Sequence, residues 1–170
     1  IFLLEDSLGI SDMSFLAGFT EEPLKFLAFM LFIKAKTEFD EPMDAIVYGT
    51  IISLGFATYE NIEYVYYIYS DQSLFIAIIR AISAIPLHAS CGVIMGYYIG
   101  LYMFKGSKKY IIQALLIPIF VHALYNFLTG FPNIIFFGYL IVVIYFANNL
   151  HKKFVAEQKQ KTFESEQKIR

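Results

Sequence analysis

Acidic, basic and histidine side chains lie within long apolar stretches of this sequence, where charged groups are rare. An ionisable side chain at membrane depth costs about 2.5–3.5 kcal/mol or more, so it is by default a candidate for function. Carboxylates accept protons and bind metal ions, and histidine does both. Such a set could support hydrolysis, metal binding or proton transfer. Its members are Glu21, Glu22, Lys25, Glu60, Asn61, Glu63, Arg80, His88, His122 and Asn126.

The composition indicates an integral membrane protein. Of the 170 residues, 58% are hydrophobic and only 16% are charged. The apolar residues come in runs of about 20, the length that a helix needs to cross a bilayer. The net charge of −2 excludes a nucleic-acid binder that depends on bulk positive charge. The single cysteine, Cys91, excludes an internal disulfide and a cysteine-cluster zinc site.

Polar clusters divide the chain into five apolar segments, which predict an all-α, polytopic membrane bundle of about five transmembrane helices. We expect a transmembrane domain over residues 1–150 and a polar cytoplasmic tail over 151–170, which continues as a solvated helix. The chain opens at Ile1 with a short apolar stub, so we expect further chain before it. The predicted spans are approximately 13–33, 43–69, 74–104, 110–129 and 133–150.

The basic residues predict the orientation of these spans. Eleven of the thirteen Lys and Arg residues lie in alternate connections and in the tail. The complementary connections contain neither Lys nor Arg. Because cytoplasmic loops are enriched in these residues, we predict that the N-terminus faces outward and the C-terminus inward.

The polar residues are predicted to share a level in the bilayer. With a rise of about 1.5 Å per residue, Glu22 and Glu60 lie about 14 Å from the outer end of their spans. The same count places His122 at about 10 Å and His88 at about 20 Å. Antiparallel helices would therefore bring Glu22, Glu60 and His122 to a similar level in the outer half of the bilayer, with His88 somewhat deeper.

Small residues near these positions predict close helix packing. His88 begins an i,i+4 ridge of three glycines, and such ridges let helix backbones approach each other. Glu60 shares a face with Ser53 and Ala57, so it should also face a neighbouring helix. Pro23 leaves two structures open: Thr20 caps a helix that begins at the glutamates, or the helix is continuous and kinked. The ridge glycines are Gly92, Gly96 and Gly100.

Each polar residue also has a purely structural interpretation. Glu21 and Lys25 could form only a buried ion pair, and a single histidine could form only an interhelical hydrogen bond. Arg80 could snorkel or neutralise an acid, and Glu63 is close enough to the outer interface to be solvated. These interpretations do not explain why acids, histidines and an asparagine from four helices share one level. We therefore favour a water-containing polar site.

Four motifs of the sequence, EEPLK, FATYEN, IPLHASCG and HALYN, resemble in order and spacing the PrsW family of intramembrane proteases. That family belongs with the CAAX prenyl proteases and Abi-type membrane proteins. The resemblance covers approximately residues 17–146. In the CAAX proteases the second motif ends in histidine, whereas the matching position here is Glu60, so their mechanism cannot be transferred unchanged.

The resemblance implies hydrolysis of a peptide bond in a membrane-anchored, single-span protein such as an anti-sigma factor, in a prokaryotic plasma membrane. Two chemistries fit. In one, Glu60, His88 and His122 bind Zn²⁺, which lowers the pKa of a water, and Glu22 is the general base. In the other, no metal is needed. One glutamate of the pair Glu21 and Glu22 activates water directly, while His122 and Asn126 donate to the oxyanion. We favour the metal version slightly.

Two other function classes compete with the protease hypothesis. Buried acids and histidines could relay protons or bind a cation in a transporter or channel. Against that class, the sequence shows no internal repeat and no pair of broken helices. The second class is a catalytically silent relative that acts as a membrane chaperone or immunity protein. The presence of all four motifs argues against loss of activity.

Overall fold

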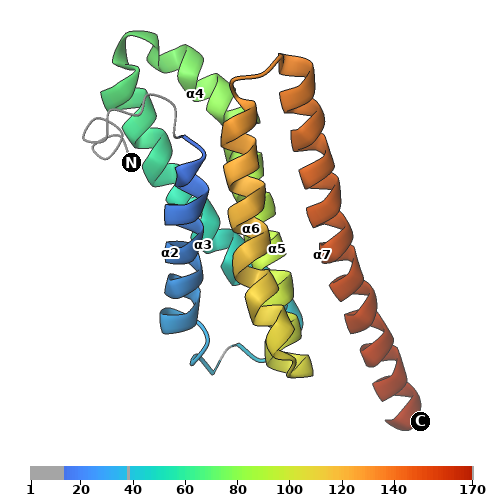
Figure 1. The fold of residues 1–170 in the computed structure, drawn as a ribbon. Coiled ribbons are helices and arrows are strands. Elements are labelled where there is room, and N and C mark those ends of the chain that lie inside the picture. The colour runs from blue at the N-terminus through green and yellow to red at the C-terminus, as the bar shows by residue number, and fades with distance from the viewer. Residues whose placement is uncertain (1–13, 38, 170) are drawn as a thin grey trace.

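The computed structural model describes residues 14–37 and 39–169, with side chains described as far as residue 160. Within these residues the chain is helical and has no strand, which confirms the predicted all-α class. The helices α2, α3, α5 and α6 pack side by side, and α7 leans away along one edge (Figure 1). The elements are α2 (Leu16–Phe32), α3 (Pro42–Glu63), η1 (Tyr64–Ile68), η2 (Ser70–Gln72), α4 (Ser73–Ile82), α5 (Ala84–Lys105), α6 (Lys108–Leu128) and α7 (Asn133–Ile169).

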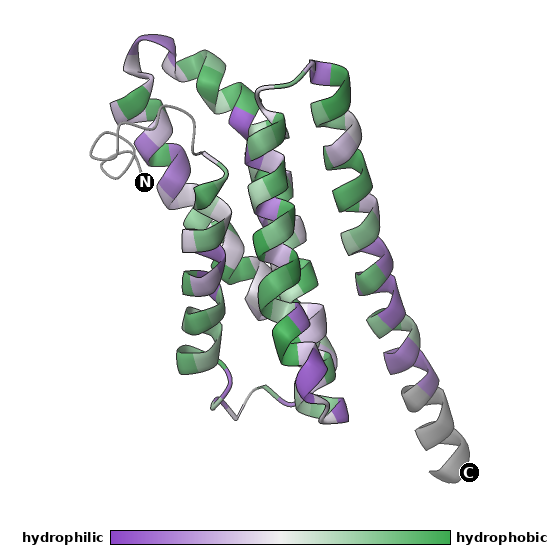
Figure 2. Ribbon diagram, in the orientation of Figure 1, coloured by the Kyte–Doolittle hydropathy of each residue, from purple (hydrophilic) through white to green (hydrophobic). Residues whose placement is uncertain are grey.

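Three helical stretches of the described chain are long and apolar enough to cross a membrane, namely Ser70–Lys105, Lys108–Leu128 and Asn133–Gln160. Large apolar side chains remain exposed on every long helix, as contact with lipid requires. Figure 2 shows that hydrophobic residues, in green, make up most of the helical ribbon. These features confirm an integral membrane protein. The spans predicted over α2 and α3, the orientation of the termini and the division at residue 150 stay predictions.

The segment predicted as one span over 74–104 is divided into two helices. Ser83 interrupts it with φ −124° and ψ −65° between the end of α4 and the start of α5. Its hydroxyl donates to the Ile79 carbonyl at 2.7 Å, and such local bonds compete with helix continuation. Pro86 follows in the first turn of α5, where a missing N–H costs nothing. With ten residues, or about 15 Å, α4 is too short to cross a bilayer by itself.

Two further boundaries differ from those predicted. The segment 43–69 is α-helical only as far as Glu63 and then widens into the π-helical turn η1. In α2, Pro23 lies inside a continuous helix, so the second of the two structures left open by the sequence is the observed one. Thr20 is not a cap: its hydroxyl donates back to the carbonyls of Leu16 and Ala17 at 3.3 and 3.2 Å.

Glycines allow two close helix contacts around the polar residues. A Cβ at Gly92 on α5 would lie 2.6 Å from the carbonyl oxygen of Gly49 on α3. A Cβ at Gly18 on α2 would lie 2.6 Å from the backbone nitrogen of Ala123 on α6. Real side chains do not approach backbone so closely, so only glycine allows these contacts. The predicted close packing along the ridge that begins at His88 is therefore present, and it holds α5 against α3.

The last helix, α7, is peripheral. It packs mainly on α5, where the rings of Tyr97 and Phe154 lie 4.5 Å apart, and it contributes no residue to the polar cluster described below. The helix continues without a break through residue 150, and its polar part follows directly on its apolar part (Figure 2). The predicted helical tail is thus the same helix as the last span.

Candidate active site

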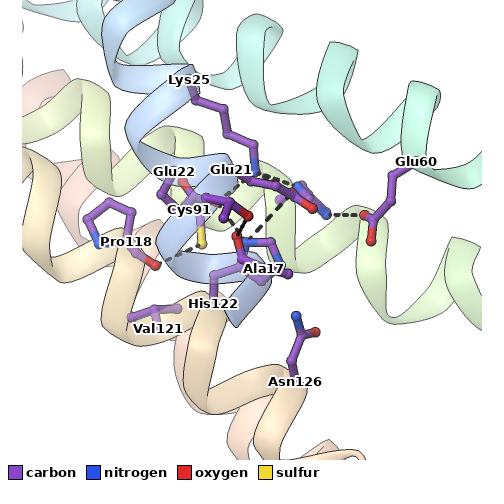
Figure 3. Close-up of polar contacts among 12 residues, drawn as sticks. Ala17, Glu21, Glu22, Lys25, Glu60, Cys91, Pro118, Val121, His122 and Asn126 are labelled. Atoms are coloured by element: carbon purple, nitrogen blue, oxygen red, sulfur yellow. Dashed lines mark hydrogen bonds and ion pairs between the residues drawn. The ribbon is translucent and has the colours of Figure 1, made fainter. Parts of the chain in front are cut away.

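Six ionisable side chains from four helices meet inside the bundle (Figure 3). They form one connected set of polar contacts, in which no two successive members are more than 3.4 Å apart. The close α3–α5 and α2–α6 packing sets this arrangement, because it draws the four helices toward a common point. α2 supplies Glu21, Glu22 and Lys25, α3 supplies Glu60, α5 supplies His88, and α6 supplies His122.

Glu22 is the acidic centre of the cluster. Its side chain is fully buried, and its Oε1 accepts from Lys25 Nζ at 2.6 Å and from His122 Nδ1 at 2.8 Å. Its second oxygen, Oε2, is buried without a hydrogen-bond partner. A buried carboxylate is tolerated when charged and polar groups compensate it, and both partners of Glu22 do so.

Lys25 links the glutamate pair to the second half of the site. Its Nζ lies 2.8 Å from His88 Nδ1 and 3.4 Å from Glu21 Oε2, in addition to its bond with Glu22. On the other side of its ring, His88 Nε2 lies 3.0 Å from Glu60 Oε2. The rings of His88 and His122 are 4.9 Å apart and nearly perpendicular, so the two halves of the cluster are in contact.

Arg80 pairs with Glu60. Of the two interpretations given for this arginine, snorkelling or neutralising an acid, the structure shows the second. Its Nη2 lies 2.8 Å from Glu60 Oε2, and its Nε donates to Asn61 Oδ1 at 2.6 Å. Its guanidinium also stacks 4.0 Å from the ring centre of Tyr64. These contacts connect α4 and η1 to the edge of the site.

The chemistry of the partners assigns the protons on both histidines. An ionised carboxylate only accepts and an ammonium only donates. His122 therefore carries its hydrogen on Nδ1, facing Glu22, and keeps a lone pair on Nε2, which none of the described hydrogen bonds uses. His88 accepts from Lys25 on Nδ1, so its hydrogen is on Nε2 and is donated to Glu60.

The structure brings together one set of donors that could hold a metal ion, with Glu21 as its carboxylate. Ligand atoms of Glu21, His88 and His122 all lie within 4.8 Å of one another. The Oε2 of Glu21 is buried without a hydrogen-bond partner, and His122 Nε2 has its lone pair available. One carboxylate with two imidazoles is an accepted set for catalytic Zn²⁺, so these residues fit the ion by type. The ligand role predicted for Glu60 stays a prediction, since its described contacts are with His88 and Arg80.

Asn126 stands apart from these contacts. It lies one turn beyond His122 on α6, and its Nδ2 donates to the backbone carbonyl of Ser14 at 2.9 Å. Figure 3 draws it beside the cluster with no contact to the residues of the cluster. In this structure its amide is therefore used to hold the chain that leads into α2.

The site is closed. Glu22, Lys25, His88 and His122 are buried, and only Glu21 and Glu60 retain some side-chain exposure, at 14% and 16%. The polar groups contact one another directly, and the water-containing cavity expected from the sequence stays a prediction.

The sequence did not indicate the central position of Lys25. Its spacing suggested an i,i+4 pair with Glu21, yet its closest carboxylate is Glu22, at i,i+3. Its contact with His88 spans 63 positions of sequence. The only available signal was the presence of a single lysine beside two acids inside an apolar span.

Comparison with known proteins identifies the family. The model of the PrsW family of intramembrane metalloproteases matches residues 2–148. Protease PrsW of Clostridioides difficile is 35% identical over 143 residues, covering 75% of this chain and 60% of that protein. Protease PrsW of Bacillus subtilis is 40% identical over 130 residues, covering 74% and 58%. The chain thus spans about 60% of the length of these relatives, and no solved structure matches it.

The match extends over the four motifs and all four helices that supply the polar cluster. It confirms the resemblance that the motifs indicated. The chain belongs to the PrsW family of intramembrane metalloproteases.

Proposed function

We propose that this chain contains the catalytic centre of an intramembrane peptidase, which hydrolyses a peptide bond of a membrane-anchored protein. The observation that carries the proposal is the pair Glu21 and Glu22 beside His122, with Glu22 Oε1 2.8 Å from His122 Nδ1. Peptide hydrolysis needs a base that takes a proton from water and donors that stabilise the charge on the carbonyl oxygen. The cluster contains both kinds of group.

Glu21 is the better placed of the two glutamates to accept a proton from water. Its side chain is the more exposed, and its Oε2 has no hydrogen-bond donor. Glu22 is fully buried, and its Oε1 is already engaged by Lys25 and His122. The second oxygen of Glu22 is a further proton acceptor when Glu21 is engaged elsewhere. This assignment moves the role of base from Glu22, where the sequence placed it, to its neighbour.

His122 takes its orientation from Glu22. A carboxylate that accepts from Nδ1 fixes the ring and leaves Nε2 facing away from that bond. In the neutral ring this nitrogen accepts a proton, and in the protonated ring it donates to a developing oxyanion or to the leaving amine. Asn126 becomes a second donor only after its amide leaves the Ser14 carbonyl.

The family is one of metalloproteases, and Glu21, His88 and His122 are the residues that would hold the ion. A bound Zn²⁺ supplies Lewis acidity, which polarises a carbonyl and lowers the pKa of a water. Glu60 and Arg80 then orient His88 from outside that set, as the outer partners of metal-binding histidines do.

The substrate is inferred to be a single-span membrane protein, for example of the anti-sigma-factor kind. With the predicted orientation, Glu21 and Glu60 lie toward the outer side of the bilayer. A peptide bond inside a helix has its carbonyl engaged and its backbone covered by side chains. We therefore place the cleaved bond in an extended segment at or just outside the end of the substrate helix, near the partly exposed side chains of Glu21 and Glu60.

The test is cleavage of a co-expressed single-span substrate in membranes. Glu21→Gln keeps the size of the side chain and removes the proton acceptor, so cleavage should fall about 10²–10⁴-fold. Glu157→Gln is the matched control, because this glutamate lies outside the site and forms an exposed ion pair with Lys105. Wild-type cleavage by Glu21→Gln would overturn the assignment. Ion flux without any cleavage by the wild type would favour a transporter.

A further inference from the structure

Lys25 presents a buried cation to the very atoms that would bind a metal. Its side chain is fully buried, and its Nζ lies 2.6 Å from Glu22 Oε1, 2.8 Å from His88 Nδ1 and 3.4 Å from Glu21 Oε2. Two carboxylate oxygens and one imidazole nitrogen are also what a divalent cation selects. Two of these three residues, Glu21 and His88, belong to the metal-binding set.

His88 cannot bind a metal ion while Lys25 keeps its present position. Its Nδ1 lone pair accepts from the ammonium, and its Nε2 carries the hydrogen donated to Glu60. A neutral imidazole has only one lone pair, so no site on the ring is left. Binding requires either that Lys25 leave Nδ1, or that the proton move to Nδ1, where it would face the ammonium.

Electrostatic repulsion also opposes the binding of a metal ion beside the Lys25 ammonium. An ion held by Glu21, His88 and His122 would lie among groups that already contact the Lys25 ammonium. The donor atoms now lie up to 4.8 Å apart, whereas ligands about 2.1 Å from one tetrahedral ion lie about 3.4 Å apart. The ligands would have to draw inward around a second positive charge, and repulsion in a buried site is screened only weakly.

We propose that the Lys25 ammonium and a divalent metal ion compete for Glu21 and His88, so that Lys25 sets the metal affinity of this site. Lys25 is thus a positioning residue that holds the cluster together in the metal-free state and moves away from His88 when an ion binds. The inference rests on the proposed catalytic site, but its test measures metal rather than cleavage.

The experiment measures Zn²⁺ affinity of the purified full chain by competition with a chromophoric chelator. Lys25→Met keeps an unbranched side chain of similar length and removes the charge. Its affinity should be about 10–100-fold tighter than that of the wild type, a change as large as, and opposite in sign to, the loss seen when a residue that supports a metal ligand is removed. Lys105→Met is the matched control, because it removes an exposed lysine from an ion pair outside the site and should leave the affinity unchanged.

Two further variants serve as controls, one for the location of the ion and one for folding. Adding His122→Ala to Lys25→Met should abolish the gain, which shows that the tighter ion lies in this site. Lys25→Gln keeps a hydrogen-bond donor for Glu22, so it serves if Lys25→Met does not fold, and its affinity should also be tighter than that of the wild type. Added Zn²⁺ should raise the unfolding temperature of either variant more than that of the wild type.

An unchanged or weaker Zn²⁺ affinity in the folded Lys25 variants would overturn the inference. The result of the Zn²⁺-affinity experiment can be distinguished from that of the cleavage experiment. Cleavage by the wild type together with unchanged affinity in the variants refutes only the competition. A gain in affinity in a protein whose wild type cleaves no substrate refutes only the peptidase.

Discussion

Exchanging each glutamate of the pair for glutamine should separate catalysis from stability. Glu22 accepts two charge-assisted contacts at 2.6 and 2.8 Å in a fully buried position. Contacts of this kind contribute about 1.5–3 kcal/mol each. Removing one member of a buried ion pair costs about 3–5 kcal/mol, because the other charge is left uncompensated. Glu22→Gln should therefore lower the free energy of unfolding by about 3 kcal/mol or more.

Glu21→Gln, in contrast, should leave the free energy of unfolding nearly unchanged and lower the cleavage rate. This glutamate is partly exposed, its Oε2 accepts no hydrogen bond, and its nearest cation is 3.4 Å away and already paired with Glu22. Loss of its charge should change the unfolding free energy by about 1 kcal/mol or less, the range of weak ion pairs. Its cleavage rate should nevertheless fall by about 10²–10⁴-fold.

Both quantities can be measured on the same preparations. Unfolding in mixed micelles gives the stability, and cleavage of a reconstituted single-span substrate gives the rate, with Glu157→Gln as the control for loss of a surface carboxylate. Equal losses of stability in the two variants would refute the division of roles. So would a cleavage rate of Glu21→Gln that equals that of the wild type.

Three other changes test the remaining contacts. The double change Glu22→Gln with Lys25→Met should recover much of the stability lost in the single change, since no buried charge is stranded, while cleavage stays low because His122 has lost its carboxylate. Arg80→Gln should lower the cleavage rate by more than its loss of stability explains. A fall in rate that the loss of stability fully explains would make Arg80 only a structural residue. Gly92→Ala should destabilise by about 1–3 kcal/mol in an unfolding titration, because its Cβ would meet α3 backbone. Gly55→Ala, with nothing within 4 Å of its Cβ, should not destabilise.

Much of this architecture could be predicted from the sequence, because hydropathy and spacing act locally. The ridge of glycines after His88 indicated which face of that helix packs closely, and that face does meet α3. The break at Ser83 was not predictable, because the surrounding residues are as apolar as those of an unbroken span. A hydroxyl bonded to the Ile79 carbonyl and a proline three residues later bend the chain without changing its composition.

The site was predictable in membership but not in its pairings. Depth along each helix placed Glu22, Glu60 and His122 at one level, which depends only on helical rise. Which carboxylate faces which imidazole depends on rotation of the helices and on the reach of long side chains. Lys25 therefore contacts His88, Glu60 contacts only His88 of the two imidazoles, and Glu21 lies within 4.8 Å of both, although no spacing in the sequence distinguishes these arrangements.

Hydrolysis in isotopically labelled water shows directly whether this chain cleaves a peptide bond. The purified full chain is reconstituted into vesicles with a single-span substrate in water enriched in ¹⁸O, and the products are analysed by mass spectrometry. We expect one new C-terminal carboxylate that carries ¹⁸O from the water, and we expect its formation to fall about 10²–10⁴-fold in Glu21→Gln. An intact substrate, together with proton or cation flux across the same vesicles, would contradict the assignment of this site as a peptidase.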